Sequence, residues 1–358
     1  MKELRDLREK IHKCSKCGLC QAVCPLYQIT GNDCTVSRGQ FIMLKGLIEG
    51  KLQMTKSLNR YLDLCLKCEK CSEFCPSGIN AVDIIASAKY EYFKTDKLEK
   101  LKSFAQKHFI FGLMLNVLSI FARNKKSKTF DKKVIYFGGC GDKLIGNTAV
   151  VNILNSINIE VISPKFNCCG IPYYTRGDFE NLKGCINSYI SILKKNEIRE
   201  IVTACASCEK ALKSYEKWCS NDEDKDFLSK LKVKNIYEYL RENNYKSKLK
   251  NKIKVTYHKP CNMHNYEDIE TILNSVENLE YIKSEKYNLC CGLNGISKPK
   301  ELSVMKKLFH IKRKDFENTG AKIVLTSCIG CKTALNLYSK GKYKALNMIS
   351  FLNKYTQK

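Results

Sequence analysis

Apolar runs of strand length alternate with segments of helical spacing over residues 131–358. Four of the strand-like runs are each followed directly by a cysteine, and they cover residues 134–139, 200–204, 254–260 and 323–327. The segments of helical spacing cover residues 147–158, 179–195, 268–278 and 301–316. Strand–helix alternation predicts parallel sheets, in which ligand-binding side chains gather at the carboxyl ends of the strands. The pattern therefore predicts an α/β fold with its chemistry at the ends of these four runs.

The same region is a duplication. Its first half contains five cysteines, which are Cys140, Cys168, Cys169, Cys205 and Cys208. They recur 121 to 123 residues later as Cys261, Cys290, Cys291, Cys328 and Cys331. The flanking residues agree, because IVTACASCEKAL at 201–212 matches VLTSCIGCKTAL at 324–335. We therefore expect two similar α/β units facing each other, residues 131–250 and 251–358, each with five thiolates for one metal site.

Eight further cysteines form two runs near the N-terminus. Each run has the spacing C-x2-C-x2-C-x3-C followed by proline, as in bacterial two-cluster ferredoxins. The runs are Cys14, Cys17, Cys20 and Cys24, then Cys65, Cys68, Cys71 and Cys75. In such proteins the fourth cysteine of each run binds the other cluster. We therefore expect one 4Fe–4S cubane on Cys14, Cys17, Cys20 and Cys75, and a second on Cys65, Cys68, Cys71 and Cys24.

Zinc is the alternative metal for these two runs, because C-x2-C is also zinc spacing. Two such pairs would suffice for zinc, which would leave the third cysteine and the proline of each run unexplained. The spacing therefore favours iron–sulfur clusters. Three cysteines belong to neither pattern, and we interpret Cys34, Cys185 and Cys219 as packing thiols.

Composition and charge add two constraints. The chain has 21 cysteines in 358 residues, an odd number, and its first residues, MKELRDLREK, do not resemble a signal peptide. We therefore expect metal ligands rather than disulfides, and a cytoplasmic location. The net charge of +26 favours nucleic acid, an anionic membrane face or an acidic protein as partner. Because the lysines are spread along the chain and no helicase or nuclease motif occurs, we expect no nucleic-acid partner.

Residues 96–130 form a basic linker between the predicted N-terminal domain, residues 1–95, and the duplicated region. Its apolar part, residues 108–123, is shorter than the roughly 20 residues that a bilayer span needs. We interpret it as a helix packed on the protein or on a partner. The alternative is an amphipathic helix on an anionic membrane, which would place the protein peripherally on the inner face of the cytoplasmic membrane.

Two histidines, His258 and His264, flank Cys261. We expect a hydrogen bond to backbone or to cluster sulfur rather than proton donation to a substrate thiolate. No dinucleotide-binding glycine motif follows a strand, and no phosphate-binding loop occurs. The sequence identifies no catalytic residue, and two-electron chemistry on an organic substrate would therefore belong to a flavin on another polypeptide.

The whole chain resembles the iron–sulfur protein family with paired CCG domains, which includes the glycolate oxidase iron–sulfur subunit and heterodisulfide reductase. Residues 17–40, CGLCQAVCPLYQITGNDCTVSRGQ, and 62–79, LDLCLKCEKCSEFCPSGI, are similar to the oxidase subunit. Both five-cysteine sets are complete, as in heterodisulfide reductase, whereas oxidase-type subunits often replace some of these cysteines.

The resemblance implies a helical dicluster ferredoxin-like domain followed by two α/β CCG units. It implies one or two further iron–sulfur clusters at the CCG cysteines, either non-cubane 4Fe–4S clusters with five thiolate ligands or ordinary ones. The function it implies is electron transfer from a flavoprotein partner to a quinone or another carrier, within a 2-hydroxy-acid dehydrogenase. The alternative is a disulfide reductase that splits an S–S bond at a CCG-bound cluster.

Overall fold

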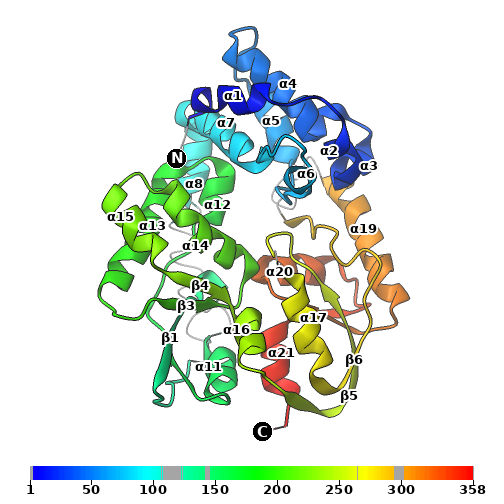
Figure 1. The fold of residues 1–358 in the computed structure, drawn as a ribbon. Coiled ribbons are helices and arrows are strands. Elements are labelled where there is room, and N and C mark those ends of the chain that lie inside the picture. The colour runs from blue at the N-terminus through cyan, green and yellow to red at the C-terminus, as the bar shows by residue number, and fades with distance from the viewer. Residues whose placement is uncertain are drawn as a thin grey trace. The chain divides into compact units, whose positions relative to one another are not determined.

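The computed structural model describes residues 3–105, 107, 122, 124–141, 146–263, 265–293 and 302–357 (Figure 1). Most of the apolar segment 108–123, and His264, therefore lie outside the described residues. The chain divides into two compact units, each made from several stretches. The first contains Met1–Phe104, Pro172–Asn181 and Leu289–Lys312, and the second contains Ala105–Ile171, Leu182–Asn288 and Arg313–Lys358. The predicted fold class, a helical N-terminal part followed by α/β repeats, is confirmed.

The first unit is helical. Its elements are α1 (Arg8–His12), α2 (Leu19–Val23), α3 (Pro25–Thr30), α4 (Ser37–Ile48), α5 (Lys56–Leu64), α6 (Lys70–Glu73), α7 (Ala81–Thr95) and α8 (Lys97–Ala105). Thr55 caps the start of α5, and Asn80 caps α7 by accepting a hydrogen bond from the Asp83 amide. Leu44, Leu62 and Ile85 are fully buried in the shared core of α4, α5 and α7. This core supports the cysteine runs that lie between the helices.

The second unit contains two parallel four-stranded sheets. The first joins β1 (Lys132–Tyr136), β2 (Ile159–Ile162), β3 (Glu200–Thr203) and β4 (Lys232–Asn235) in the order β2-β1-β3-β4. The second joins β5 (Ser247–His258), β6 (Val276–Tyr281), β7 (Ile323–Thr326) and β8 (Lys344–Asn347) in the order β6-β5-β7-β8. The strand order reverses beside β1 and beside β5, and ligands of parallel sheets bind at such switch points.

Helices follow the strands in the same order in both halves, except that α15 of the first half has no counterpart in the second. The first half has α11 (Thr148–Asn155), α14 (Ala206–Trp218), α15 (Asp222–Ser229) and α16 (Ile236–Glu242), and the second has α17 (Tyr266–Asn274), α20 (Ile329–Tyr338) and α21 (Met348–Tyr355). The residues of α12 (Ile171–Arg176), α13 (Phe179–Lys194) and α19 (Leu302–Asn318) are divided between the two units. Asn235 ends β4 and caps α16, and Asn347 ends β8 and caps α21, so the duplication extends to single capping residues.

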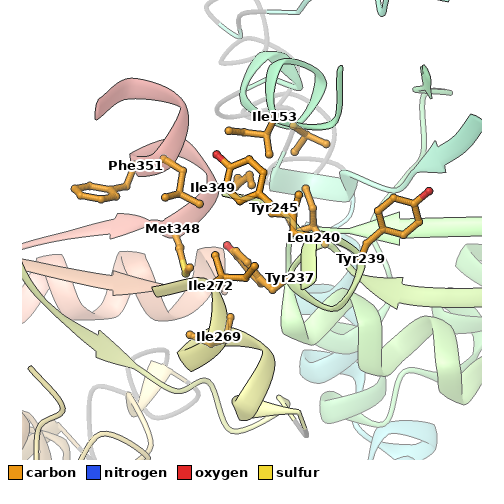
Figure 2. Packing of buried hydrophobic residues seen from close by; sticks show 14 of the residues in the cluster. Ile153, Tyr237, Tyr239, Leu240, Tyr245, Ile269, Ile272, Met348, Ile349 and Phe351 are labelled. Atoms are coloured by element: carbon orange, nitrogen blue, oxygen red, sulfur yellow. The ribbon is translucent and has the colours of Figure 1, made fainter. Parts of the chain in front are cut away.

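One hydrophobic core joins the two halves of the second unit. Helix α11 of the first half packs on α21 of the second, and α16 of the first packs on α17 of the second. Ile153, Tyr237, Ile272 and Ile349 are almost completely buried in this core (Figure 2). The polar contacts are reciprocal too, because Asn152 on α11 donates to Asn353 on α21 at 2.8 Å and Arg241 on α16 pairs with Asp268 on α17. The halves therefore associate with approximate two-fold symmetry, as a pair of identical chains would.

One predicted helix was too long. The spacing predicted a helix over residues 268–278, but α17 ends at Asn274 and β6 begins at Val276. Val276 is β-branched and buried, and it pairs with Ser247 of β5 in the parallel ladder. Tertiary pairing therefore overrides the helical pattern in the last turn.

Within the described residues, no helix has the length and apolar character that crossing a membrane requires.

Candidate metal centres

The two N-terminal cysteine runs fold in the same way. In each run the third cysteine lies in a short helix, Cys20 in α2 and Cys71 in α6. The residue directly before that helix adopts a left-handed conformation, at Gly18 with φ of 87° and at Glu69 with φ of 62°. The left-handed residue turns the backbone sharply between the second and third cysteines. The repeated spacing therefore produces a repeated loop.

Five cysteines line one pocket in the first unit. They are Cys14, Cys17 and Cys20 of the first run and Cys71 and Cys75 of the second. The pocket therefore brings three cysteines of the first run together with the last cysteine of the second, and Cys71 borders it as well. Burial is the main cause that raises the pKa of Cys20, and the nearby Cys14 and Cys17 raise it further. A group of four thiols is the donor set that a 4Fe–4S cubane takes.

Cys24 lies with the second run instead. Burial is the main cause that raises the pKa of Cys24, and the thiol of Cys65 raises it further. Burial also raises the pKa of Cys71 to about 12, with further contributions from Cys65 and Cys24. Cys68 is half-buried in the loop between Lys67 and Glu69. The structure thus brings the last cysteine of the first run to Cys65 and Cys71 of the second.

Hydrogen-bond donors surround these sulfur atoms. The backbone N–H groups of Tyr27 and Leu26, at the start of α3, donate to Cys24. Ser37 Oγ lies 3.0 Å from Cys71 Sγ, and the Lys67 N–H lies 3.4 Å from Cys65 Sγ. Donors of this kind stabilise thiolate charge and tune bound clusters. The donor set and its surroundings therefore fit two iron–sulfur clusters.

A buried lysine adjoins the second run. Lys67 is 7% exposed, and its Nζ lies 3.4 Å from the Cys65 carbonyl oxygen. Burial and, after it, the charge of Lys89 together lower the pKa of Lys67 to about 8. Lys67 was not predicted as a site residue. The sequence could have pointed to Lys67 through the repeat, because Lys16 occupies the equivalent position in the first run.

In the second unit the predicted cysteines follow the strands as expected. Cys140 comes after β1, Cys168 and Cys169 come after β2, and Cys205 follows β3. In the other half Cys261 comes after β5 and Cys328 follows β7. Cys205 and Cys328 are the residues that precede α14 and α20, so Cys208 and Cys331 lie in the first turns of those helices. The carboxyl ends of parallel strands meet at one edge of a sheet, which is why sequence positions so far apart converge.

Seven thiols form one continuous row in this unit. Cys168 lies beside Cys140 and Cys169, and Cys208 lies beside Cys169 and Cys205. Cys328 lies beside Cys205 and Cys331. All five cysteines of the first repeat are therefore gathered, and the row continues into the second repeat through the Cys205–Cys328 contact.

Ionisation in this row is uneven. The hydrogen bond to Cys168, followed by burial, raises the pKa of Cys140 well above its ordinary value. Hydrogen bonds from Cys168 and Cys208 lower the pKa of Cys169 to about 6. Neighbouring buried thiolates repel one another, so such a row cannot ionise together without a compensating cation. Iron supplies that positive charge when thiolates bind it, and the donor set fits a thiolate-ligated cluster.

The second five-cysteine set is divided between the two compact units. Cys261, Cys328 and Cys331 belong to the second unit, while Cys290 and Cys291 belong to the first, where both are buried. The Gly292 N–H lies 3.4 Å from Cys290 Sγ. Binding of one cluster by all five of these cysteines therefore stays a prediction.

His258 lies at the end of β5 and is fully buried. One of its ring nitrogens lies within 4.8 Å of Cys331 Sγ, and its ring meets that of Phe316 edge-on with centroids 6.4 Å apart. His264, the other predicted histidine, lies outside the described residues. The position of His258 is compatible with the expected hydrogen bond to cluster sulfur.

The two repeats differ in what surrounds the thiols. Around the first set, Phe137, Phe166, Tyr189 and Tyr215 form a chain of ring contacts with centroids 4.8 to 5.6 Å apart. The Tyr215 hydroxyl donates to the Cys169 carbonyl at 2.9 Å. Near Cys328, by contrast, Asn262 donates to Ser207 at 3.0 Å, and Ser207 Oγ lies 3.4 Å from Cys328 Sγ. Ser207 and Asn262 were not predicted, because neither residue has a metal-binding side chain.

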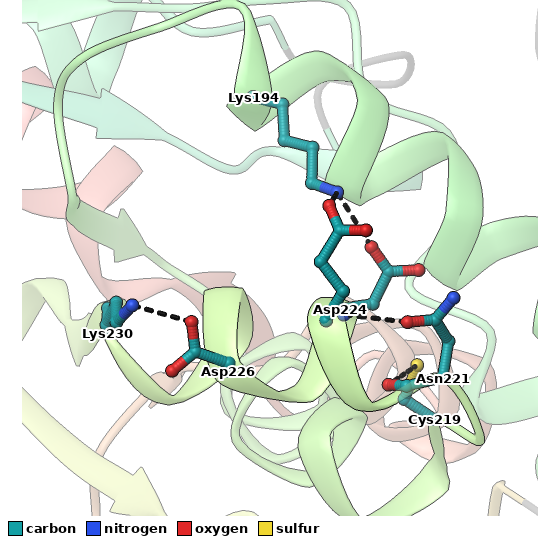
Figure 3. A network of polar contacts seen from close by, with 7 residues as sticks. Lys194, Cys219, Asn221, Asp224, Asp226 and Lys230 are labelled. Atoms are coloured by element: carbon teal, nitrogen blue, oxygen red, sulfur yellow. Dashed lines mark hydrogen bonds and ion pairs between the residues drawn. The ribbon is translucent and has the colours of Figure 1, made fainter.

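The three remaining cysteines belong to neither the N-terminal runs nor the five-cysteine sets, although Cys185 packs close to the first set. Cys219 follows α14, and its thiol donates to the Asn221 carbonyl at 3.7 Å beside the surface ion pair of Lys194 and Asp224 (Figure 3). Cys185 packs next to Gly170, and Cys34 lies half-buried in a short turn before α4. These positions agree with packing roles.

Comparison with known families matches both parts of the chain. Residues 10–79 match the 4Fe-4S dicluster domain, and residues 134–213 and 255–336 match the cysteine-rich CCG domain. The glycolate oxidase iron-sulfur subunit of Escherichia coli is 23% identical over 97% of this chain and 95% of its own length. A subunit of the dihydromethanophenazine:CoB–CoM heterodisulfide reductase from Methanosarcina mazei is 23% identical over 91% of this chain and 88% of its own length.

Among solved structures, a hypothetical protein from Helicobacter pylori aligns with a TM-score of 0.53 and 13% identity. The alignment covers 89% of this chain and 68% of that one. At this identity the likeness concerns the fold alone. The sequence relatives, by contrast, span both the dicluster part and the duplicated part of this chain.

Proposed function

The chain belongs to the iron–sulfur protein family in which a 4Fe-4S dicluster domain precedes paired CCG domains, and from this premise we propose a specific role. It is the iron–sulfur electron-transfer subunit of a flavin-dependent 2-hydroxy-acid dehydrogenase of the glycolate oxidase kind. Electrons pass from the flavin of a partner protein through this chain to a quinone or another carrier. The similarity to the oxidase subunit over nearly the full length of both chains carries the proposal.

The cysteines would bind the clusters in the sets predicted from their spacing. Cys14, Cys17, Cys20 and Cys75 line one pocket, which Cys71 also borders, and Cys24 lies near Cys65 and Cys71. When bound, 4Fe–4S clusters accept and donate single electrons. The chain's own residues hold the thiolates in place, exclude bulk water from Cys169 by burial, and direct N–H groups at sulfur. Substrate oxidation then belongs to the flavoprotein.

For the terminal acceptor we propose a carrier at an anionic membrane surface. Helix α8 supports this, because Leu98, Leu101 and Phe104 are 51%, 62% and 60% exposed. Lys100 and Lys102 flank this apolar face on either side, and lysines beside an apolar stripe suit a surface of anionic lipids. The protein would then be cytoplasmic and peripheral.

A vesicle-binding experiment tests this part of the proposal. A Leu101→Asp variant is expected to lose sedimentation with phosphatidylglycerol vesicles, while Leu337→Asp, at an equally exposed position on α20, is expected to retain it. Retained binding by both variants would end this part of the proposal.

The main experiment uses the full chain, purified without oxygen and reconstituted with iron and sulfide. About 16 iron atoms per chain are expected if all four sites hold 4Fe–4S clusters. The chain is then mixed with a flavoprotein subunit of the glycolate oxidase kind, a 2-hydroxy acid and an artificial electron acceptor. Reduction of the acceptor only when both proteins are present supports the proposal. Reduction by the flavoprotein alone at the same rate would contradict it.

A second function is favoured by a specific observation. Both CCG sets are complete, and the thiol row runs from one repeat to the other through Cys205 and Cys328. Two adjacent thiolate-bound clusters would suit a disulfide reductase, in which an S–S bond is split at a CCG-bound non-cubane cluster and each sulfur takes one electron and one proton. The relative from Methanosarcina mazei is named as a heterodisulfide reductase subunit.

The two functions differ in what the isolated chain does. The reconstituted protein is reduced with a low-potential dye and offered several small disulfides, with thiol release as the readout. We expect no turnover from the chain alone. Rapid cleavage that disappears in Cys291→Ser, but not in Cys219→Ser, would favour the reductase over the electron-transfer subunit.

A further inference from the structure

The two N-terminal cysteine runs carry the same lysine in different environments. Lys16 precedes Cys17, and Lys67 precedes Cys68, so each lysine lies between the first two cysteines of its run. Both have left-handed backbones, with φ of 59° and 55°. Lys16 is exposed to solvent, whereas Lys67 is only 7% exposed. The local sequence is therefore repeated, but the burial of its charge is not.

Lys67 is not alone in its buried surroundings. Lys89 on α7 is 4% exposed and pairs with Asp63 on α5. The charges that act on Lys67 are those of Lys89, Cys65 and Asp63. One carboxylate therefore faces two ammonium groups. Burying a lysine beside a second lysine costs free energy unless an anion compensates it.

The compensating anion is the cluster that the second run would bind. Thiolate-ligated 4Fe–4S clusters carry net negative charge, and reduction adds one more negative charge. A fixed ammonium group in a buried position favours the more negative state, and the low local dielectric strengthens this effect. The same charge on Lys16 is screened by solvent and salt. Glu69, a buried carboxylate in the same loop, is not among the charges that act on Lys67, so Asp63 is the carboxylate that does.

We propose that Lys67 is a potential-tuning residue, which raises the reduction potential of the cluster on Cys65, Cys68, Cys71 and Cys24 above that of the cluster on Cys14, Cys17, Cys20 and Cys75. The inference rests on the proposed electron-transfer function and deepens it. An electron shared by the two clusters resides mainly on the second one. Lys67 moves no proton in this role; it acts by position and charge.

The test is a redox titration of the full reconstituted chain, followed by electron paramagnetic resonance. A Cys68→Ser variant assigns the midpoint of the second cluster, because that midpoint is the one it removes or alters. Lys67→Gln is expected to lower this midpoint by about 59 mV, which corresponds to a tenfold change in the ratio of reduced to oxidised cluster for one electron. Lys67→Arg, which keeps the charge, is expected to retain the wild-type midpoint. Lys16→Gln, the matched control, is expected to leave both midpoints unchanged.

Equal displacements in Lys67→Gln and Lys16→Gln, or none in either, would overturn the inference. If Lys67→Gln does not retain the second cluster, Lys67→Met takes its place, since it removes the charge and keeps the length of the buried side chain. A loaded Lys67→Met protein with an unchanged midpoint would also overturn it. Wild-type protein without N-terminal cluster signals would contradict the proposed function and the inference together. Signals with unmoved midpoints would contradict the role of Lys67 alone.

Discussion

The two CCG repeats share a scaffold but not the surroundings of their cysteines. Sheet order, the strand that each first cysteine follows, and the asparagine caps of α16 and α21 are the same in both. The residue three positions before the first cysteine is Phe137 in one repeat and His258 in the other. Phe137 joins an aromatic cluster, while the imidazole of His258 lies near Cys331.

The difference shows that duplication reproduces the position of the ligands more strictly than their environment. Strand ends and helix starts place the thiols through the backbone, and the backbone tolerates many side chains around them. The aromatic cluster excludes water, and its Tyr215 hydroxyl donates to a backbone carbonyl, whereas a histidine and an asparagine–serine pair offer hydrogen bonds to sulfur. We therefore expect the two sites to differ in redox properties even if both hold the same kind of cluster.

The largest expected effect is loss of a cluster. Cys140→Ser and Cys261→Ser change equivalent ligands, and each is expected to lower the iron content by about four atoms per chain. Iron analysis of anaerobically reconstituted protein measures this, with Cys219→Ser as the control that keeps its iron. If only one of the two variants loses iron, the repeats differ in occupancy and not only in surroundings. Stoichiometric zinc with about 8 iron atoms would contradict iron at both CCG sites.

The next effect concerns the core that joins the repeats. Ile349 on α21 is 1% exposed and packs in the core that contains residues of both sheets. Ile349→Ala is expected to lower the free energy of unfolding by about 2–5 kcal/mol, because it leaves a cavity. Circular dichroism during chemical denaturation is expected to show both repeats unfolding in one transition. Leu337→Ala, at an exposed position, is the control with a change within about 0.5 kcal/mol. Two separate transitions would mean that the repeats are independent.

Exchanging Phe137 and His258, the residues that differ at the equivalent position, tests directly whether the two environments matter. Phe137→His places an imidazole between Phe166 and Tyr189, whose contacts with residue 137 are ring contacts. Stability is expected to fall by about 1–3 kcal/mol, since a buried polar group would lack good partners. His258→Phe is expected to cost less in stability but to alter the spectrum of the second site. Equal and small losses in both variants would show that the two environments are interchangeable.

The smallest expected effect is on the polar link between the repeats. Asn262→Ala removes the hydrogen bond to Ser207, which in turn lies beside Cys328. The expected cost is about 1 kcal/mol of unfolding free energy. Asn152→Ala, which removes a hydrogen bond at the far α11–α21 contact, provides a matched control of similar cost but without a spectral change. A spectral change in Asn152→Ala and none in Asn262→Ala would show that the hydrogen bond between Asn262 and Ser207 does not influence the cluster site.

Several parts of the fold could be predicted because their signals are local or periodic. The strands that precede Cys140, Cys205, Cys261 and Cys328 are apolar and β-branched, and the structure contains β1, β3, β5 and β7 there. The edge strands β2, β4, β6 and β8 were not predicted. Lys232–Asn235 and Lys344–Asn347 are short and partly polar, and they extend only because a neighbouring strand pairs with them.

The sequence by itself determined the kind of protein, because metal-ligand spacing is local and the offset of 121 to 123 residues is independent of any contact. It placed the cysteines at strand ends, and thereby the α/β class. Only the tertiary structure decided which thiols meet across long separations, as with Cys24 beside Cys65 and Cys205 beside Cys328. It also decided that Lys67 is buried while Lys16 is exposed. The burial of Lys67 depends on how α5 and α7 pack against its loop. The cysteine spacing, which is the same in both loops, contains no information about that packing.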